Sequence, residues 1–393
     1  MYKSIYLKKG KEESLRRFHP WIFSGAIHHI DEQVEEGEIV RVLTLSGEFL
    51  AVGHYQIGTI TVRVLSFEDC EINDYFWRLK IQTAFELRKA IGVIAGEHNN
   101  TYRLIHGEGD NLPGLVIDCY GDTAVIQAYS IGMHISRYVI CDALLAVWKV
   151  STPSVYYKSE TTLLHKIGVG LENGFIVGKK NDNIVVENGL KFQVDWIKGQ
   201  KTGFFIDQRD NRSLLEKFAE GRSVLNMFSY TGGFSVYAMR GGAKLVHSVD
   251  SSPKAIDLTN ANIKLNFQND SRHESFCEDA FKFLDRSDDK YDLIILDPPA
   301  FAKHRAALHN ALKGYIRLNT RGFEKIKQRG LLFTFSCSQI VTKENFRNAV
   351  FTAATLAGRK VRILYQLHQP ADHPVNIFHP EGEYLKGLVL YVE

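Results

Sequence analysis

Cysteines, long hydrophobic runs and net charge are all scarce in this 393-residue chain, and each shortage excludes a class of protein. The five cysteines include no C-x-x-C pair, so we expect neither a disulfide framework nor a zinc site nor another metal. No apolar run approaches the roughly 20 residues of a membrane span, and the first residues lack the apolar segment of a secretory signal. A net charge of +3 is too small to predict a nucleic-acid partner by itself. We therefore expect a reduced, cytoplasmic protein without membrane association.

The chain does have the composition of a globular protein, with 45% hydrophobic and 24% charged residues, and enough length for two or three domains. Residues 1 to about 70 predict a β-rich module, because short β-branched segments alternate with glycines. The next segment is mixed α and β. It predicts a helix ending at Gly92, hairpin strands around the turn GDNLPG, and an amphipathic helix over residues 131–150.

The second half predicts a ligand site at one edge of a parallel sheet. Residues 223–233 (SVLNMFSYTGG) predict a buried strand, a tight loop and a helix start, an arrangement that holds nucleotide-like ligands at a helix N-terminus. Four further strands would end at the same edge of the sheet. Their ends are expected at Asp250 (in LVHSVD), just before Asp279 (in CEDA), at Asp297 (in LDPPAF) and at Cys337 (in FSCS). The glycines do not form G-x-G-x-x-G, so the dinucleotide fingerprint is missing. Together these features predict an S-adenosylmethionine site beside a cysteine.

Each strand end offers a ligand for that cofactor. Asp250 is placed to accept hydrogen bonds from ribose hydroxyls, and Asp279 from the adenine amino group. Two strands are expected to meet near Gly199, before a helix that begins around Arg209. At that junction, Gln208 either meets the methionine end of the cofactor or caps the helix. The expected cofactor-binding residues are Gln208, Phe228, Tyr230, Gly232, Asp250, Ser251, Asp279 and Asp297.

Cys337 and Asp297 are the candidate catalytic residues. Carbon 5 of a pyrimidine is a poor nucleophile, but attack of a thiolate on C6 pushes electron density to C5, which then accepts a methyl group. Cys337 is placed for that attack if its thiol is activated, although an isolated cysteine is more often a small buried residue. Asp297 would hold the cytosine edge by accepting from its N4 amino group, or would assist proton transfer.

Two basic segments are candidates for RNA contact. In the N-terminal module, cations alternate with aromatic residues. This pattern suits binding of a nucleic acid backbone with bases stacked on the rings. It is equally typical of a solvated basic face beside a core tryptophan. Between residues 301 and 330, eight cations face one acid, Glu324, and this imbalance favours a phosphate-bearing partner. The expected RNA-binding residues are Lys8, Arg16, Arg17, His19, Trp21, Lys303, Arg305 and Arg317.

Taken together and in order, the motifs resemble those of the bacterial 23S rRNA 5-methylcytidine methyltransferases of the large-subunit methyltransferase I family. FHPWIFSGAI resembles the start of that family's RNA-binding PUA domain, and GEGDNLPGLVIDCY the signature of its central domain. Five further segments resemble motifs of the family's methyltransferase domain: TGFFIDQRDNR, NMFSYTGGFSVYA, DPPAF, SCS and HPEGEYLKG. His379, before Pro380 in the last segment, departs from the family pattern, and this departure puts no catalytic residue in doubt.

The resemblance implies an α/β protein in three parts, with S-adenosylmethionine as methyl donor, ribosomal RNA as partner and Cys337 as nucleophile. A PUA domain would span residues 1–72, a central α+β domain residues 73–186, and a class I (Rossmann-like) S-adenosylmethionine-dependent methyltransferase domain residues 187–393.

Other interpretations stay open. The D-P-P motif also suits methylation of guanine nitrogen, and a non-catalytic RNA-binding or ribosome-assembly factor could retain the cofactor pocket. The glycine spacing argues against a nicotinamide-dependent dehydrogenase. The apolar segment GLVLYV, if it is an edge strand, could pair with a second copy in a homodimer or close the sheet. The spacing of His368, His373 and His379 does not predict a metal site, since no cysteine or helix accompanies it.

Overall fold

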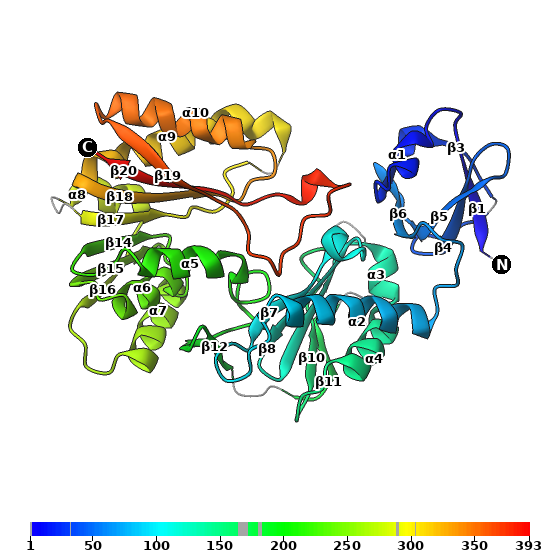
Figure 1. Ribbon diagram of the computed structural model, residues 1–393, viewed down its shortest axis with the longest axis horizontal. Helices are drawn as coiled ribbons and strands as arrows, with labels where there is room; N and C mark the ends of the chain where they lie inside the picture. The colour runs from blue at the N-terminus through cyan, green and yellow to red at the C-terminus, as the bar shows by residue number, and fades with distance from the viewer. Residues whose placement is uncertain (1, 32, 164–171, 180–182, 288–290, 303) are drawn as a thin grey trace. The chain divides into compact units, whose positions relative to one another are not determined.

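The computed structural model describes residues 2–31, 33–163, 172–179, 183–287, 291–302 and 304–393 (Figure 1). The chain forms two compact units. The first unit comprises Met1–Gly189, Val194–Ile206 and Ala371–Gly382, and the second comprises Leu190–Gln193, Asp207–Pro370 and Glu383–Glu393. A segment near the C-terminus therefore belongs to the same unit as the N-terminus. The division into three domains at 72/73 and 186/187 stays a prediction.

The N-terminal part of the first unit is a six-stranded sheet, as the β-rich sequence predicts. Its strand order is β2-β6-β5-β4-β1-β3, and alternate side chains such as Val40 and Val42 are buried in its core. The strands are β1 (Lys3–Leu7), β2 (Trp21–Phe23), β3 (Ile27–Ile30), β4 (Ile39–Leu43), β5 (Phe49–Tyr55) and β6 (Ile60–Ser66), and the short helices are α1 (Glu13–Arg16) and η1 (Ser24–Ala26).

The second sheet of this unit has the order β11-β10-β9-β8-β7 and packs against helices. The predicted hairpin is confirmed, since β7 and β8 pair antiparallel around η2 (Gly107–Asp110). The predicted helix over residues 131–150 is wrong as a single element, because the backbone of Ser136 (ψ 0°) ends one helix and begins the next. The elements are α2 (Asp74–Ala90), β7 (Thr101–His106), β8 (Leu115–Tyr120), β9 (Thr123–Ala128), α3 (Ile131–Ile135), α4 (Arg137–Val147), β10 (Ser154–Tyr157), β11 (Gly174–Val177) and β12 (Ile184–Glu187).

The second unit is built on a seven-stranded sheet with the order β16-β15-β14-β17-β18-β20-β19. The five strands from β16 to β18 pair parallel, which confirms that their carboxyl ends share one edge. Helices α8 to α10 cover one face and α5 to α7 the other (Figure 1). The strands are β13 (Leu190–Gln193), which packs apart from this sheet, β14 (Ser223–Met227), β15 (Leu245–Asp250), β16 (His273–Cys277), β17 (Tyr291–Leu296), β18 (Ile326–Ser336), β19 (Val361–Leu367) and β20 (Lys386–Val392). The helices are α5 (Arg209–Glu216), α6 (Gly233–Arg240), α7 (Pro253–Asn266), α8 (Ala280–Arg286), α9 (Leu308–Lys325) and α10 (Lys343–Leu356).

Two expectations about strands are wrong. The segment GLVLYV is not an edge strand, because β20 pairs antiparallel with β18 on one side and with β19 on the other. Residues 194–206 form turns rather than a strand that meets another near Gly199. Positive φ angles at Lys201 (48°) and Gly203 (109°) interrupt extended backbone there.

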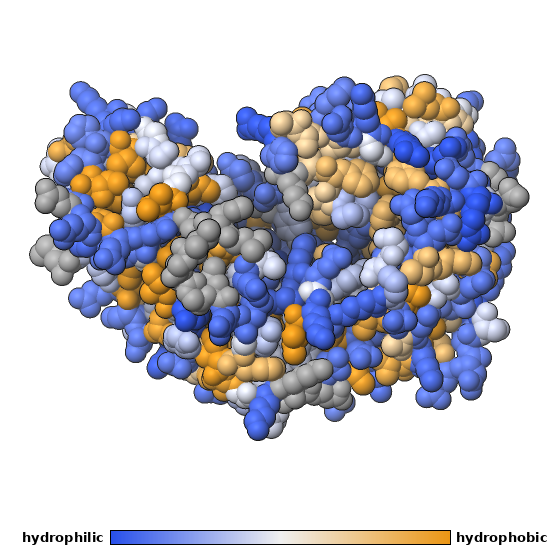
Figure 2. Space-filling model, turned by 180° about the vertical axis from the view of Figure 1, so that it is seen from behind, coloured by the Kyte–Doolittle hydropathy of each residue, from blue (hydrophilic) through white to orange (hydrophobic). Residues whose placement is uncertain are grey.

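Hydrophobic and hydrophilic side chains are intermixed on the face that Figure 2 shows. Within the described part of the chain, none of the helices has both the length and the hydrophobicity that crossing a membrane requires.

Candidate active site

The loop after β14 has a strained backbone. Phe228 (φ 59°), Tyr230 (φ 47°) and Gly232 (φ 74°) all lie in the left-handed region, which non-glycine residues rarely adopt. The backbone N–H of Gly232 donates to the carbonyl of Ser229 at 2.8 Å, and Thr259 Oγ1 donates to the carbonyl of Tyr230 at 2.9 Å. Such strain persists where neighbouring contacts hold it, and it is concentrated at ligand sites.

This loop has the features of a cradle for a nucleotide-like ligand. A Cβ atom at Gly232 would lie 2.8 Å from Thr259 Cγ2, so only glycine fits there. Helix α6 begins at the next residue without a side-chain cap, which leaves first-turn N–H groups available to a ligand. The buried Oγ of Ser229 has no hydrogen-bond partner among the described residues. Ser229, which sequence reasoning missed, is therefore a further candidate ligand.

Asp250 and Asp279, the residues expected at the ribose and the adenine, each accept hydrogen bonds from neighbouring backbone. The two carboxylate oxygens of Asp250 accept from the backbone N–H groups of Tyr230 and Ser252, each at 2.9 Å. Asp279 caps α8, with Oδ1 accepting from the backbone at 3.0 and 3.1 Å. Since a carboxylate offers about four acceptor positions, both residues keep capacity for ribose or adenine groups. Ser251, beside Asp250, is exposed. Their roles as cofactor ligands stay predictions.

Gln208 joins the start of α5 to the end of β17. Its Nε2 donates to Asp297 Oδ2 at 3.0 Å, and its Oε1 accepts from Asn211 Nδ2 at 2.6 Å. Gln208 occupies the N-cap position of α5, but its side chain accepts no hydrogen bond from the backbone N–H groups of the helix, so the capping alternative is wrong. Asn211, which sequence reasoning missed, fixes the amide so that its N–H group faces Asp297. Asp207 accepts from the hydroxyl of Tyr384 at 2.7 Å.

The backbone on either side of Cys337 is held by its two serine neighbours. Ser336 Oγ donates to the Tyr315 hydroxyl at 2.9 Å, and Ser338 Oγ donates to the carbonyl of Ala302 at 2.7 Å. Both serines are buried, whereas Cys337 is half-buried. The Ser-Cys-Ser turn is thus fixed at its flanks, with the cysteine as its more accessible member.

Lys386 is a cation close to the cysteine. It is 5% exposed, and its Nζ donates to the carbonyls of Ser338 at 2.6 Å and Tyr384 at 2.7 Å. Burial lowers the pKa of Lys386 to about 8, and the charge of Cys337 acts in the opposite direction. Sequence reasoning missed Lys386, although it lies in HPEGEYLKG, because no local pattern indicates that a lysine there is buried.

Tyr315 links the two candidate catalytic residues. Burial raises the pKa of Tyr315 to about 12; the hydrogen bond from Ser336 lowers it, while the charges of Cys337 and Asp297 add to the rise. Asp297 and Cys337 follow the neighbouring parallel strands β17 and β18, and Ser338 Oγ donates to the carbonyl of Ala302 in the loop after Asp297. The expected grouping of these two residues is therefore supported by the geometry.

The basic segment of residues 301–330 is less unbalanced than its sequence indicates. Arg321 pairs with Asp285 at 3.0 Å and Glu324 at 2.7 Å, and Lys327 pairs with Asp292 at 3.2 Å. Acids from other elements thus neutralise part of the charge, which the local sequence could not show.

Three residues of that segment were expected to bind RNA. Arg305 is exposed in η4 (Arg305–Ala307), and Arg317 is exposed on α9, with its guanidinium 4.4 Å from the ring centre of Phe281. Lys303 lies outside the described residues.

The expected RNA-binding residues of the first unit fall into two groups. Lys8, Arg16 and Arg17 are exposed, and Arg16 pairs with Glu48 at 2.7 Å. His19 and Trp21 are half-buried. The indole N–H of Trp21 donates to Glu108 at 2.8 Å, and its ring centre lies 4.3 Å from that of His379. This geometry favours the alternative interpretation of Trp21 as a packed residue beside a basic face.

Family models match two parts of the chain. Residues 173–346 match the model described as S-adenosylmethionine-dependent methyltransferase, and residues 5–67 match a PUA-like domain. The second match covers the six-stranded sheet, and the first covers most of the strand-end site described above.

Similar proteins match the whole chain. The ribosomal RNA large subunit methyltransferase I of Tolumonas auensis is 40% identical, and that of Aeromonas hydrophila 41%, each over 99% of both chains. Among solved structures, a methyltransferase complexed with SAH is 25% identical over 99% of both chains, with a TM-score of 0.85. The similarity therefore extends over the whole chain and is not confined to the part that carries the strand-end site.

Proposed function

Because the chain belongs to the ribosomal RNA large subunit methyltransferase I family, we propose that it methylates carbon 5 of a cytosine in large-subunit ribosomal RNA. The cofactor is S-adenosylmethionine. The observation that carries the C5 assignment is Cys337, placed between two anchored serines and near Asp297 and a buried lysine. A nitrogen acceptor would need no such cysteine.

The loop of residues 228–232 would hold the cofactor, with Asp250 at the ribose and Asp279 at the adenine. When bound, S-adenosylmethionine supplies an electrophilic methyl group, so the protein has to position and activate the acceptor. The left-handed backbone of the loop and the unpartnered hydroxyl of Ser229 fit this use. The target base would be flipped out of its stack to reach the strand ends.

Cys337 would activate the acceptor carbon. Its thiolate adds to C6 of the cytosine, and the π electrons of the C5–C6 bond move to C5, which becomes nucleophilic. After methylation at C5, a base removes the C5 proton, the C5–C6 double bond forms again, and the carbon–sulfur bond breaks to return the thiolate. The ammonium group of Lys386 near the sulfur would stabilise the thiolate at the start and at the end.

Asp297 would orient the base. Gln208 already donates to one of its oxygens, and the remaining acceptor positions suit the N4 amino group of cytosine. The same arrangement would also accept an amino group of guanine, which makes guanine-nitrogen methylation the second candidate.

The test is transfer of labelled methyl groups into ribosomal RNA that lacks its own modifications, followed by nucleoside analysis. We expect labelled 5-methylcytidine. Labelled guanosine would establish the second candidate, and no label in ribosomal RNA or in assembled subunits would leave a non-catalytic RNA-binding factor.

A further inference from the structure

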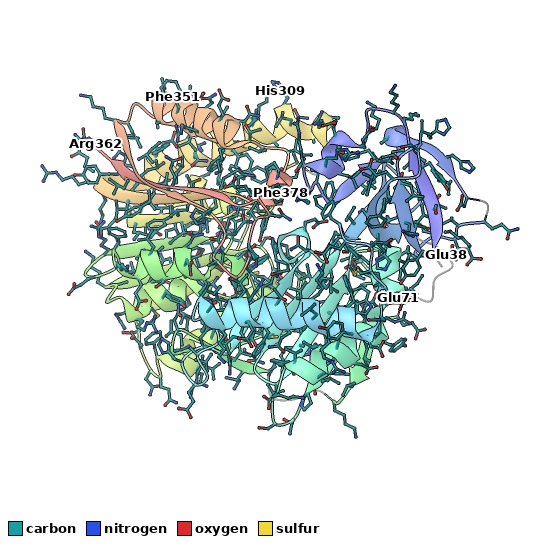
Figure 3. The ribbon with its side chains drawn as sticks, turned by 45° about the vertical axis from the view of Figure 1, so that its right-hand side comes forward. Glu38, Glu71, His309, Phe351, Arg362 and Phe378 are labelled. Atoms are coloured by element: carbon teal, nitrogen blue, oxygen red, sulfur yellow. The ribbon has the colours of Figure 1, made fainter. Side chains whose placement is uncertain are left out.

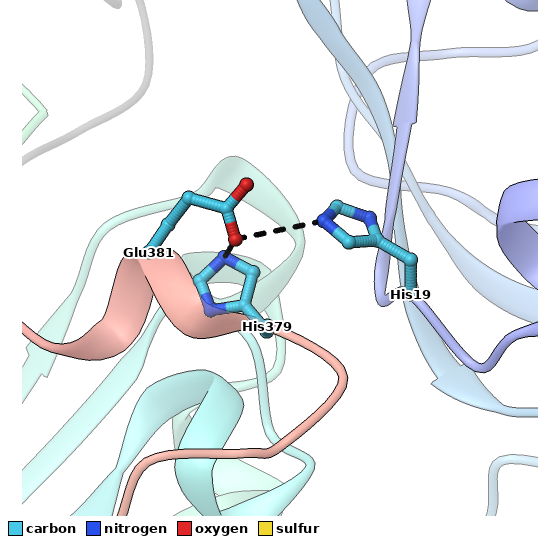
Figure 4. A group of neighbouring side chains, drawn as sticks. All are labelled: His19, His379 and Glu381. Atoms are coloured by element: carbon cyan, nitrogen blue, oxygen red, sulfur yellow. Dashed lines mark ion pairs between the residues drawn. The ribbon is translucent and has the colours of Figure 1, made fainter.

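Three potential metal ligands from distant parts of the sequence meet in the first unit. His19 precedes β2, and His379 and Glu381 lie at η5 (Pro380–Gly382) in the segment of residues 371–382 (Figure 4). Their ligand atoms all lie within 4.8 Å of one another. We propose that these three side chains bind one divalent transition-metal ion, with zinc as the first candidate.

The distances suit one ion after a small adjustment. The Nε2 atoms of His19 and His379 each lie 3.8 Å from Glu381 Oε2. Around tetrahedral zinc, with bonds of about 2.0–2.2 Å, ligand atoms lie roughly 3.4 Å apart. The side chain of Glu381 is 52% exposed and can rotate toward both rings, and a small movement of the half-buried His19 ring would bring the two imidazole nitrogens, which lie within 4.8 Å of each other, to the same ion. The exposure of Glu381 also leaves a fourth position to water.

His379 provides the second, independent indication of a ligand. Its side chain is 3% exposed, and neither ring nitrogen has a hydrogen-bond partner among the described residues. A buried polar group without a partner is energetically unfavourable, so such groups usually have an additional ligand. Contact with the Trp21 ring limits the orientations of the imidazole.

His19 is oriented as metal-binding histidines usually are. Its Nδ1 lies 3.2 Å from the carbonyl oxygen and 3.3 Å from the backbone nitrogen of Trp21, and its Nε2 is the atom near Glu381. With the proton on Nδ1, the ring donates to that carbonyl and leaves the lone pair of Nε2 for an ion. In metal sites, the ring nitrogen that does not bind the ion typically donates to a carbonyl or carboxylate. Glu108, which accepts from the Trp21 indole, adds negative charge near His379 and so favours a cation.

The ligand types select the metal. Two imidazoles and one carboxylate suit zinc and neighbouring transition metals, whereas calcium and magnesium prefer oxygen ligands. No cysteine belongs to this group, in contrast to the structural zinc sites that cysteine spacing reveals.

The ion would join the N-terminal sheet to the segment of residues 371–382. A side-chain contact already links these parts of the first unit, since the ring centres of Phe18 and Phe378 lie 5.3 Å apart. The same segment also contacts the hairpin of β7 and β8, where Asn376 Nδ2 donates to the carbonyl of Glu108 at 3.3 Å. Phe378, next to His379 in sequence, is labelled in Figure 3. Because metal would bind only the folded arrangement, it would stabilise this unit in proportion to its free concentration.

The experiment starts with the full chain freed of metal by a chelator and desalting. Zinc is then titrated, and both bound metal per chain and the melting temperature are measured. We expect about one tightly bound zinc and a rise in melting temperature. Glu381→Gln and His19→Gln should each weaken zinc binding by at least about tenfold and remove the stabilisation.

A matched control is available in the same sheet. The Nε2 of His29 lies 3.8 Å from Asp31 Oδ1, the same distance as in the proposed site, but this pair has no third ligand among the described residues. His29→Gln should therefore bind zinc as the unchanged protein does. Glu381→Asp should restore part of the affinity that Glu381→Gln loses.

Cobalt in place of zinc identifies the ligand type. We expect visible bands of cobalt bound by nitrogen and oxygen, without the near-ultraviolet absorption that thiolate ligands cause. Absence of tight zinc binding, equal binding by Glu381→Gln, or a thiolate absorption from one of the five cysteines would each overturn the proposal.

Discussion

The strand-end site of the second unit and the histidine group of the first unit are assembled in opposite ways. In the strand-end site, the loop of residues 228–232, Asp250, Asp279, Asp297 and Cys337 each follow a strand of one sheet. In the histidine group, His19 comes from near the N-terminus, and His379 and Glu381 from near the C-terminus. A site at the ends of successive strands can be predicted from the repeated strand–loop–helix pattern in the sequence. A site made by packing of distant segments has no such pattern.

The largest expected effect tests the chemistry of the strand-end site. Cys337→Ala should lower methyl transfer by at least about a thousandfold and leave affinity for S-adenosylmethionine unchanged, because only the nucleophile is removed. Cys70→Ala, at a half-buried cysteine of the first unit, is the control and should keep full activity. Turnover by Cys337→Ala near the unchanged rate would reject the thiolate mechanism.

The next effect concerns the fold of the first unit. Arg88 and Asp110 form a buried ion pair with side chains 0% and 3% exposed, so Asp110→Ala leaves a buried, uncompensated cation. We expect a loss of about 3–5 kcal/mol in the free energy of unfolding, measured with urea. Glu48→Ala breaks the exposed pair with Arg16 and should cause no resolvable change. Equal effects of the two substitutions would contradict this difference in burial.

A smaller effect is expected at the cofactor loop. Gly232→Ala meets both an unfavourable φ of 74° and a contact of 2.8 Å with Thr259, so S-adenosylmethionine should bind about tenfold more weakly. Gly221→Ala has a similar φ of 66° but open space around the new methyl group. Because Gly221 lies outside the loop, calorimetric titration should give weaker binding for Gly232→Ala and unchanged affinity for Gly221→Ala. Unchanged affinity of Gly232→Ala would show that the loop does not hold the cofactor.

The smallest effect is a pH dependence of stability. Since the pKa of Lys386 is about 8 in the folded chain and about 10.5 is its ordinary value, the unfolded state binds more protons between these values. The free energy of unfolding of the unchanged protein should therefore rise, relative to Lys386→Met, as pH increases from 8 to 10.5. Lys360→Met, at an exposed lysine, keeps Lys386, so its free energy of unfolding should change with pH in parallel with that of the unchanged protein. If the curve of Lys386→Met were also parallel to that of the unchanged protein, Lys386 would be more solvated than its burial indicates.

The predictable features of the molecule depend on local order along the chain. The parallel strands β14 to β18 and the hairpin of β7 and β8 could be predicted, because each has a local pattern of apolar residues bounded by turn residues. The position of β20 inside the sheet could not be predicted, because the sequence of an apolar strand does not indicate which strands pair with it.

Burial and tertiary pairing account for the residues that sequence reasoning missed. Asn211 orients Gln208 only once α5 is folded, and Lys386 becomes a buried cation only beside β18. Asp285 and Asp292, which pair with Arg321 and Lys327, come from other elements, so the sequence of residues 301–330 alone overstates the net positive charge of this segment.

The central claim is a covalent bond between Cys337 and C6 of a cytosine, and trapping that bond tests it most directly. Ribosomal RNA that carries 5-fluorocytosine has no C5 proton to lose at the target, so the enzyme and RNA should stay joined. We predict a denaturation-resistant complex whose RNA is attached to the peptide containing Cys337, and no complex with Cys337→Ala. Methylation of ordinary RNA without any trapped complex on the fluorinated RNA, or a complex that persists in Cys337→Ala, would contradict the account.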